Sequence, residues 1–166
     1  MVYSTTFNFK ICELTLTSDG ENLTAILFGN THSIGAVKND NLAIFKTTKT
    51  WLTEYLSGRN PTSKQPALAL SGTPFQLAVW EELKRIPYGQ TISYGEIAKN
   101  VAKKLDKQKM SAQAVGGAVG HNPIPIIMPC HRVVGADNKL TGFHGGLEIK
   151  KFLLKKENVD LTKFKD

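Results

Sequence analysis

A polar stretch with two prolines, residues 59–66, limits the fold of this chain more than any other feature. Pro61 and Pro66 each remove a backbone donor, so the stretch continues neither a helix nor a strand. A total of 166 residues suits one large domain or two small ones. We therefore predict two domains, residues 1–66 and 73–166, with the boundary within residues 60–72.

The first domain has a strand pattern followed by a helix pattern. Apolar and polar residues alternate from Phe7 through Phe9 and Ile11 to Leu16, and a turn at residues 18–21 precedes a second apolar run at 23–28. This order is typical of a hairpin. Apolar residues then follow helical spacing from 42 to 56, which predicts a helix that ends at Gly58.

Three helix starts are predicted in the second domain. Thr73, Ser93 and Ser111 each stand where a hydroxyl caps a helix, and Gln76 and Glu96 complete two capping boxes. We expect the second helix to stop near residues 105–106 and the third to span 112–120. The core face of the first helix is predicted to contain Leu77, Val79, Trp80, Leu83 and Ile86.

The second and third of these helices are short and are joined by a basic turn. They predict a helix-turn-helix, although two ordinary packed helices fit the same pattern. The third helix contains Gly116 and Gly117, and each glycine costs a helix interior about 1 kcal/mol relative to alanine. We expect these glycines to allow close approach of another backbone.

Positive charge is concentrated in the second domain. Residues 1–72 contain six Lys/Arg and five Asp/Glu, whereas residues 73–166 contain fifteen and nine, within a net charge of +7. Such a surface suits contacts to a phosphate backbone, and a solvated basic face is the alternative. The densest cluster, with Asp106 as its one acid, consists of Lys99, Lys103, Lys104, Lys107, Lys109 and Arg132.

Several classes of protein are not expected. No apolar run approaches the roughly 20 residues of a membrane span, and the N-terminus lacks a signal core, so we expect a cytoplasmic protein. Cys12 and Cys130 lie far apart and give no disulfide framework. No spaced metal-ligand pairs occur, and Cys12 with His32 would form at most a weak site. We predict no metal, no cofactor, no membrane contact and no obligate protein partner.

A reactive segment follows the third helix. Pro123 and Pro125 force their predecessors towards extended geometry, so the helix must end there. The apolar run 126–128 then leads to Cys130, which is flanked by Pro129 and His131. A free cysteine has a pKa of about 8.5 and needs a base or positive charge to become a nucleophile. Spacing alone leaves open an activated thiol or an inert buried one.

The motif around this cysteine resembles the O6-alkylguanine-DNA alkyltransferase family. The resemblance is carried by Pro129-Cys130-His131-Arg132-Val133, by residues 122–125 before it, and by residues 142–147 with Lys150 after it. It extends over residues 73–157 with high specificity. It implies an α/β protein with an N-terminal ribonuclease-H-like strand-and-helix domain and a mostly helical C-terminal domain that contains the helix-turn-helix.

The resemblance implies direct, single-turnover repair of double-stranded DNA. An alkyl group would move from O6-alkylguanine, or from O4-alkylthymine as another substrate, to Cys130. His131 resembles the water-linked base, and Glu157 the carboxylate that orients it. Asn122 resembles a hinge residue that supports the turn before the active site.

The same resemblance implies further contacts. Tyr94 would donate to the flipped base, the carbonyls of Cys130 and Val133 would accept from its amino group, Pro125 and Phe143 would wall the pocket, and the His144 amide would face O6. The DNA contacts would come from Gln113, Ala114, Gly116, Gly117 and Arg132.

Three features depart from the family pattern. Gln113 replaces the arginine that fills the gap left by the flipped nucleotide, and the basic turn at 103–109 is longer than in many relatives. The longer turn and His144, which stands where small or other polar residues are common in the family, bear on substrate range. A glutamine lacks the charged plane of arginine, so we expect less efficient intrusion into duplex DNA, partly offset by the lysines.

Three alternatives stay open. A non-catalytic relative that flags alkylated bases lacks the acceptor cysteine, which this chain has. A transcriptional regulator with the same helix-turn-helix would need sensory segments that 166 residues do not contain. A cysteine hydrolase would turn over repeatedly without DNA.

Overall fold

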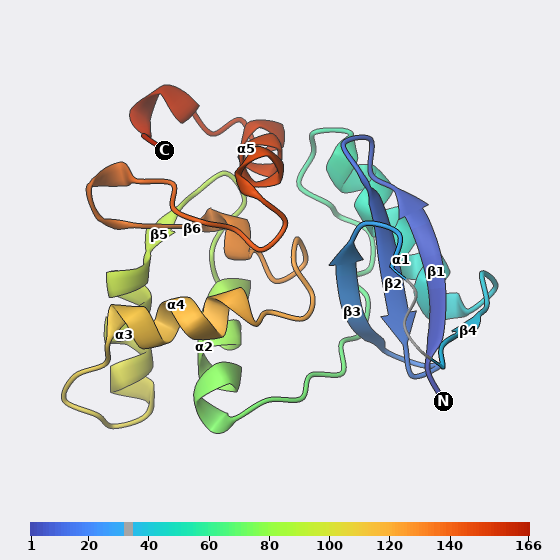
Figure 1. Ribbon diagram of the computed structural model, residues 1–166, viewed down its shortest axis with the longest axis horizontal. Coiled ribbons are helices and arrows are strands. Elements are labelled where there is room, and N and C mark those ends of the chain that lie inside the picture. The colour runs from blue at the N-terminus through green and yellow to red at the C-terminus, as the bar shows by residue number, and fades with distance from the viewer. Residues whose placement is uncertain (32–34) are drawn as a thin grey trace. The chain divides into compact units, whose positions relative to one another are not determined.

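The computed structural model describes residues 1–31 and 35–166, which form two compact units, Met1–Leu70 and Ser71–Asp166 (Figure 1). The mixed α/β class expected from the sequence is confirmed: the first unit is a sheet with a helix, and the second is mostly helical. His32, which we considered beside Cys12, lies outside the described residues.

The first unit contains a four-stranded sheet in the order β3-β2-β1-β4. Its strands are β1 (Tyr3–Asn8), β2 (Glu13–Ser18), β3 (Leu23–Phe28) and β4 (Val37–Lys38). The predicted hairpin is the antiparallel pair β2 and β3, and β1 extends it, antiparallel to β2 and parallel to β4. Ile11 does not continue the alternation, because it lies in the turn between β1 and β2 and is 41% exposed.

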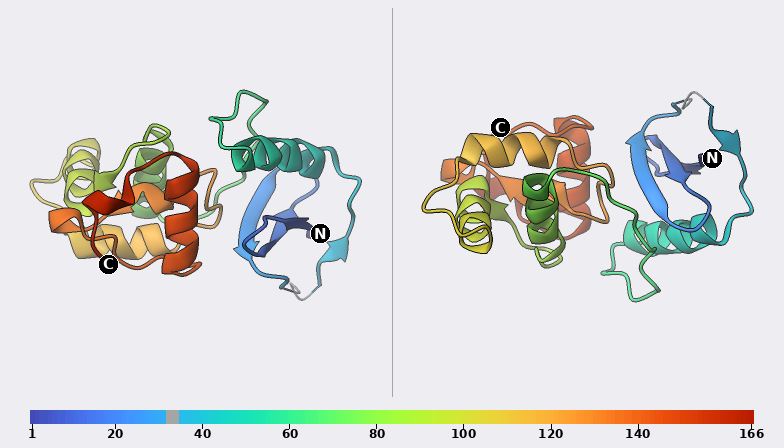
Figure 2. Two further views of the ribbon diagram at one scale, coloured as in Figure 1. Left: turned by 90° about the horizontal axis from the view of Figure 1, so that it is seen from above. Right: turned by 90° about the horizontal axis from the view of Figure 1, so that it is seen from below.

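Helix α1 (Ala43–Leu56) packs across one face of this sheet (Figure 2). The helix ends before Gly58, as the spacing predicted, and the positive φ of Gly58 suits the end of a helix. The core between helix and sheet contains Phe9, Phe45 and Tyr55, each with 0% of its surface exposed. The helix-on-sheet packing therefore supplies the apolar interior of the first unit.

The second unit begins with three capped helices, α2 (Pro74–Lys84), α3 (Tyr94–Lys104) and α4 (Ala112–Gly120). The hydroxyls of Thr73, Ser93 and Ser111 accept amide protons in the first turns, as predicted. Gln76 completes its capping box by accepting from the Thr73 amide, whereas the capping box predicted with Glu96 was wrong, because its side chain does not accept from the Ser93 amide. The predicted core face of α2 was wrong at Leu77, which is 36% exposed. Ala78 is buried in its place, because the buried stripe runs through residues 78, 79, 82 and 83.

Helix α4 is fixed against α2 and α3 by one face. The indole Nε1 of Trp80 donates to the carbonyl of Ala118 at 2.9 Å in the interior. Val115, Ala118 and Val119 are buried. The opposite face of α4 is open to solvent, including Gln113, Ala114 and Gly117. Thus α3 and α4 form the predicted helix-turn-helix, with one side of its second helix exposed.

The last part of the second unit places α5 beside the segment that follows Cys130. Strand β5 (Ile92–Ser93) pairs in parallel with β6 (Val133–Val134), and helix α5 (Leu147–Lys156) follows. Val134, Leu140 and Leu154 form a small buried cluster between them. Short 3-10 turns occupy Cys130–Arg132, Ala136–Asn138 and Leu161–Lys163. Within the described residues, none of the helices combines the length and apolar character needed to cross a membrane.

Candidate active site

Cys130 stands at the end of a buried and strained segment. After α4 ends, Ile124, Ile126 and Met128 are at most 1% exposed. Ile126 has a φ of 75°, a left-handed conformation that costs a β-branched residue on the order of 1–3 kcal/mol. Cys130 then opens the 3-10 turn and is itself 6% exposed. The expected buried segment before the cysteine is therefore present, and its backbone is strained at Ile126, four residues before Cys130.

Asn122 holds the two ends of this segment together. Its Oδ1 accepts from the amide of Ile124 at 2.9 Å, and its Nδ2 donates to the carbonyl of Met128 at 2.7 Å. The Asn122 side chain also lowers the pKa of the Cys130 thiol, which favours the thiolate. A single amide therefore fixes the loop that leads to the thiol.

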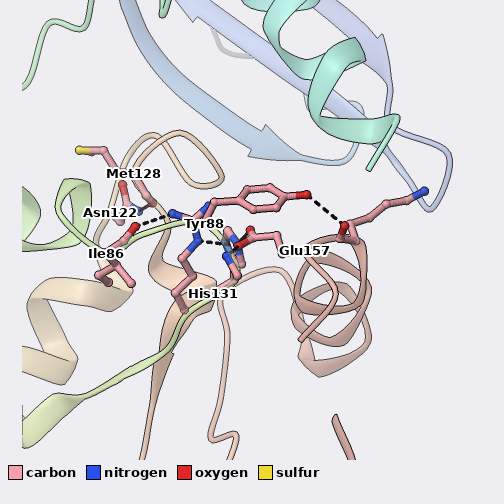
Figure 3. A network of polar contacts seen from close by, with 9 residues as sticks. Ile86, Tyr88, Asn122, Met128, His131 and Glu157 are labelled. Carbon is pink, nitrogen blue, oxygen red and sulfur yellow. Dashed lines mark hydrogen bonds and ion pairs between the residues drawn. The ribbon is translucent and has the colours of Figure 1, made fainter. Parts of the chain in front are cut away.

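Glu157, the residue after the last turn of α5, is a buried acceptor for three donors (Figure 3). His131 Nε2 lies 2.5 Å from one carboxylate oxygen, and Arg132 Nε donates to the other at 2.8 Å. The amide of Gly89 also donates to this second oxygen at 2.8 Å, from a turn in which Gly89 has a φ of 80°. Glu157 is therefore held in one orientation relative to the imidazole.

Arg132 lies inside the protein, which corrects two of our expectations. The side chain is 10% exposed, its Nη1 donates to the carbonyl of Ile86 at 2.7 Å, and its guanidinium lies 5.7 Å from the ring centre of Tyr88. It therefore adds little to the exposed basic surface, where we had expected it to contact DNA. The buried carboxylate of Glu157 supplies the reason, since a buried charge needs a partner.

Charge in the site is set by burial. Burial raises the pKa of the Cys130 thiol to about 11, although Asn122 and Lys150 oppose the rise. Burial also lowers the pKa of His131, against the opposing effect of Glu157, so its imidazole is neutral at pH 7. Burial raises the pKa of Glu157, but His131 and Arg132 outweigh it and hold that pKa at about 2. The result is a neutral thiol, a neutral imidazole and an ionised carboxylate.

The ionised carboxylate also fixes the tautomer of His131. A carboxylate accepts hydrogen bonds only, so Nε2 carries the imidazole proton and Nδ1 is the basic nitrogen. A neighbouring carboxylate of this kind raises the basicity of the ring. His131 is therefore prepared to take a proton at Nδ1.

Lys150 is a site residue for which we predicted no role. It is fully buried, and its Nζ donates to the carbonyls of Val133 at 2.7 Å and Leu140 at 2.5 Å. Burial lowers the pKa of Lys150 to about 8, against the effect of Cys130. The sequence does contain a signal, because position 150 lies three residues from both Leu147 and Leu153 on the apolar stripe of α5.

The residues expected to bind substrate lie in different environments. Pro125 and Val133 are buried, Tyr94 and Phe143 are half-buried, and His144 is exposed. Both carbonyls that we expected to bind guanine already accept one bond, Cys130 from the Val133 amide and Val133 from Lys150. Tyr94 lines a hollow of about 470 Å³ together with Gln113, Gly116 and Thr141.

The two helix glycines have open space around them within this chain. A Cβ on Gly116 would lie 3.9 Å from the ring of Tyr94, and one on Gly117 would meet nothing within 4 Å. Among the described residues, no backbone atom lies within 4 Å of the Cβ position of either glycine outside α4 itself. Their small size leaves this face of α4 open beside Gln113 and Ala114. Among the described residues, no group of three or more His, Cys, Asp or Glu is arranged to hold a metal ion.

The fold and site define a helix-turn-helix unit with a buried centre of thiol, imidazole and carboxylate. The family model described as 6-O-methylguanine DNA methyltransferase, DNA binding domain, matches residues 74–159. The model described as the ribonuclease-like domain of the same methyltransferase matches residues 2–68. This chain belongs to the 6-O-methylguanine DNA methyltransferase family, and the resemblance found in the sequence is confirmed.

Individual relatives match over nearly the whole chain. The methylated-DNA–protein-cysteine methyltransferase of Haemophilus influenzae is 38% identical over 161 residues, which cover 95% of this chain and 87% of the relative. The crystal structure of the O6-methylguanine methyltransferase of Mycobacterium tuberculosis is 40% identical, with a TM-score of 0.82 and 98% of each chain covered. A structure of that organism's OGT in complex with DNA is 37% identical, with a TM-score of 0.79, and covers 98% of this chain and 94% of that one.

Proposed function

We propose that this protein repairs DNA by transferring a methyl or other alkyl group from O6 of guanine to Sγ of its own Cys130. O4-alkylthymine would be a second substrate of the same chemistry. The observation that carries the proposal is the arrangement of Cys130, His131 and Glu157, in which a buried carboxylate fixes a neutral imidazole next in sequence to the thiol. The names of the relatives, which are methyltransferases that act on methylated DNA, support it.

The proposed reaction balances without a cofactor. His131 takes the thiol proton through a water at Nδ1, and the thiolate attacks the alkyl carbon to form the S–C bond. The C–O6 bond breaks, its electron pair stays on guanine, and the proton released by the thiol finally neutralises the guanine anion. Positioning of the thiolate in line with the departing oxygen would supply much of the rate.

The resting thiol is the energetic obstacle. With a pKa of about 11, roughly one Cys130 in ten thousand is a thiolate at pH 7, which corresponds to about 5 kcal/mol. This cost already includes the favourable effect of the Lys150 ammonium, and the basic nitrogen of His131 reduces it further by taking the proton. A thiol that is neutral at rest also resists oxidation until a substrate arrives.

The open face of α4 is the proposed contact with double-stranded DNA. Gln113, Ala114 and Gly117 are exposed there, and the turn that precedes α4 carries further exposed lysines. Extrusion of a base costs a few kcal/mol, less for a damaged and poorly paired one. We propose that Gln113 occupies the space left by the extruded nucleotide, in the position where relatives carry arginine.

We also infer a single turnover per molecule and a cytoplasmic location. A thioether does not hydrolyse, and the only other cysteine, Cys12, belongs to the first unit. Both cysteines are free thiols, as expected in a reducing compartment.

The proposal is tested by weighing the intact protein after incubation with duplex DNA that contains O6-methylguanine. We expect one added methyl group per chain in the wild type and in Cys12→Ser, and none in Cys130→Ser. An unchanged mass in the wild type would refute the proposed transfer. Binding to the lesion without a change in mass would instead identify the non-catalytic flagging function.

A further inference from the structure

Thr141 occupies an unusual position beside Tyr94. Its φ of 62° is left-handed, which is strained for a β-branched residue. Its hydroxyl donates to the carbonyl of Leu140 at 2.5 Å, and the same oxygen lies 3.3 Å from the hydroxyl of Tyr94. Both residues line the hollow of about 470 Å³ that also contains Gln113 of α4. Thr141 is therefore held next to the tyrosine, on the side of the proposed DNA contact.

The loop before Thr141 is closed so tightly that it fixes this position. The amide of Gly135 donates to the carbonyl of Lys139 at 2.7 Å. A Cβ on Gly135 would lie 2.5 Å from Cγ2 of Thr141, so only glycine leaves room for the threonine at this point. The strain at Thr141 is thus maintained by its surroundings, as at sites where backbone strain serves a function.

Counting protons gives the direction of the hydrogen bonds. A hydroxyl has one proton to donate, and that of Thr141 points at the Leu140 carbonyl. The contact between Tyr94 and Thr141 must then use the tyrosine proton. Without DNA, Tyr94 therefore donates to Thr141.

We propose that Thr141 is a positioning residue that acts through Tyr94 and reverses its hydrogen bond when the base arrives. This inference rests on the proposed function, in which Tyr94 donates to the flipped guanine. When Tyr94 turns its proton to the base, its oxygen becomes an acceptor, and the Thr141 hydroxyl rotates from Leu140 to Tyr94. A donor that itself accepts a hydrogen bond is a stronger donor. Tyr94 then stabilises the negative charge that develops on the leaving guanine.

Lys150 keeps the free-energy cost of this reversal low. Its buried Nζ donates to the Leu140 carbonyl at 2.5 Å, the same carbonyl that Thr141 releases. A buried carbonyl without any partner costs about 1–3 kcal/mol. Because Lys150 remains bound, rotation of the threonine hydroxyl leaves no such group behind.

The charges around Tyr94 are consistent with this role. Burial raises the pKa of Tyr94, the hydrogen bond with Thr141 lowers it, and the nearby Cys130 raises it. Interaction with Thr141 thus makes the phenol a better acid within a site that otherwise suppresses its ionisation. The effect of Cys130 also places Tyr94 within electrostatic range of the reacting thiol.

The test is single-turnover methyl transfer from duplex DNA containing O6-methylguanine, with maximal rate and half-saturating concentration measured separately. Thr141→Val removes the hydroxyl but keeps the shape, and Thr141→Gly removes it while relieving the strained φ. We expect each to lower the maximal rate about tenfold with little change in half-saturation. Thr141→Ser, which keeps the hydroxyl, should retain most of the wild-type rate.

The same substitutions in a Tyr94→Phe background separate positioning from a general structural effect. We expect Thr141→Val to have no further effect there, because the residue acts through the tyrosine hydroxyl. An equal loss in both backgrounds, or an unchanged rate in Thr141→Gly, would overturn the inference. Failure of the wild type to transfer methyl would overturn the proposed function itself, so the two outcomes remain distinct.

Discussion

The imidazole of His131 and the carboxylate of Glu157 meet at 2.5 Å, with neither side chain exposed to solvent. Glu157 follows the last turn of α5, whereas His131 belongs to the short turn that begins at Cys130. The contact therefore joins residues 26 positions apart and makes the orientation of His131 depend on how α5 packs. Because a carboxylate accepts only, the contact also determines which imidazole nitrogen is basic.

Glu157→Gln should lower the rate of methyl transfer about 10- to 100-fold. A neutral amide preserves the shape but stabilises an imidazolium less and no longer fixes one tautomer. The rate is measured in a single turnover, and Glu148→Gln, at an exposed position of the same helix, is the matched control. Equal rates in Glu157→Gln and the wild type would exclude Glu157 from the proton transfer.

Glu157 should also make the protein acid-sensitive. Its pKa is about 2 in the folded protein, below the ordinary value of 4.5, so its stabilising effect is complete above pH 4.5 and is lost as the pH falls towards 2. The wild type should lose about 3 kcal/mol more unfolding free energy than Glu157→Gln between pH 6 and pH 2. Urea unfolding across this range measures the difference, and parallel pH curves would contradict the assignment.

The transfer rate should be level near pH 7 and bend downward near pH 8. Because His131 takes the thiol proton within the site, the rate does not follow the bulk pH near neutrality, but the ammonium that favours the thiolate, Lys150, loses its proton near pH 8. Lys150→Met should transfer methyl about tenfold more slowly at pH 7 and show no bend. Lys155→Met, on an exposed part of α5, should follow the wild-type profile.

Gln113→Arg should speed the repair of duplex DNA. Gln113 is exposed on α4, where an arginine would add a charge and a planar group that stacks in the gap left by the extruded base. We expect a several-fold faster transfer from duplex DNA and an unchanged rate with free O6-methylguanine base. Equal rates for the variant and the wild type on duplex DNA would show that intrusion by this side chain does not limit repair.

The lysines between α3 and α4 should determine the salt dependence of DNA binding. Lys103, Lys107 and Lys109 are exposed in or beside this turn. Each phosphate contact contributes about −0.9 to the slope of log K against log salt. Replacing all three with glutamine should make the slope less steep by 2–3 in a fluorescence titration, whereas Lys46→Gln in the first unit should leave it unchanged. An unaltered slope in the triple variant would mark this turn as a solvated face.

Local signals in the sequence predicted most of the helices correctly. The caps at Thr73, Ser93 and Ser111 act over three residues, and so helix starts could be located without knowledge of the tertiary structure. The same holds for the end of α4, because prolines act on their immediate neighbours. Leu77 shows the limit, since its burial depends on which side of α2 the remaining helices pack.

The sequence by itself located the caps of three helices and, through the motif around Cys130, identified the family, but it left the helix-turn-helix open against two ordinary packed helices. The tertiary structure alone decided that Arg132 faces inward to Glu157, that Lys150 is buried beneath Val133 and Leu140, and that Thr141 meets Tyr94. Motifs and caps depend on neighbours within a few residues, whereas each of these contacts joins segments that only the packing of α5 and the loop after β6 brings together. A charged residue in a sequence therefore does not show whether its partner is water, DNA or a buried carbonyl.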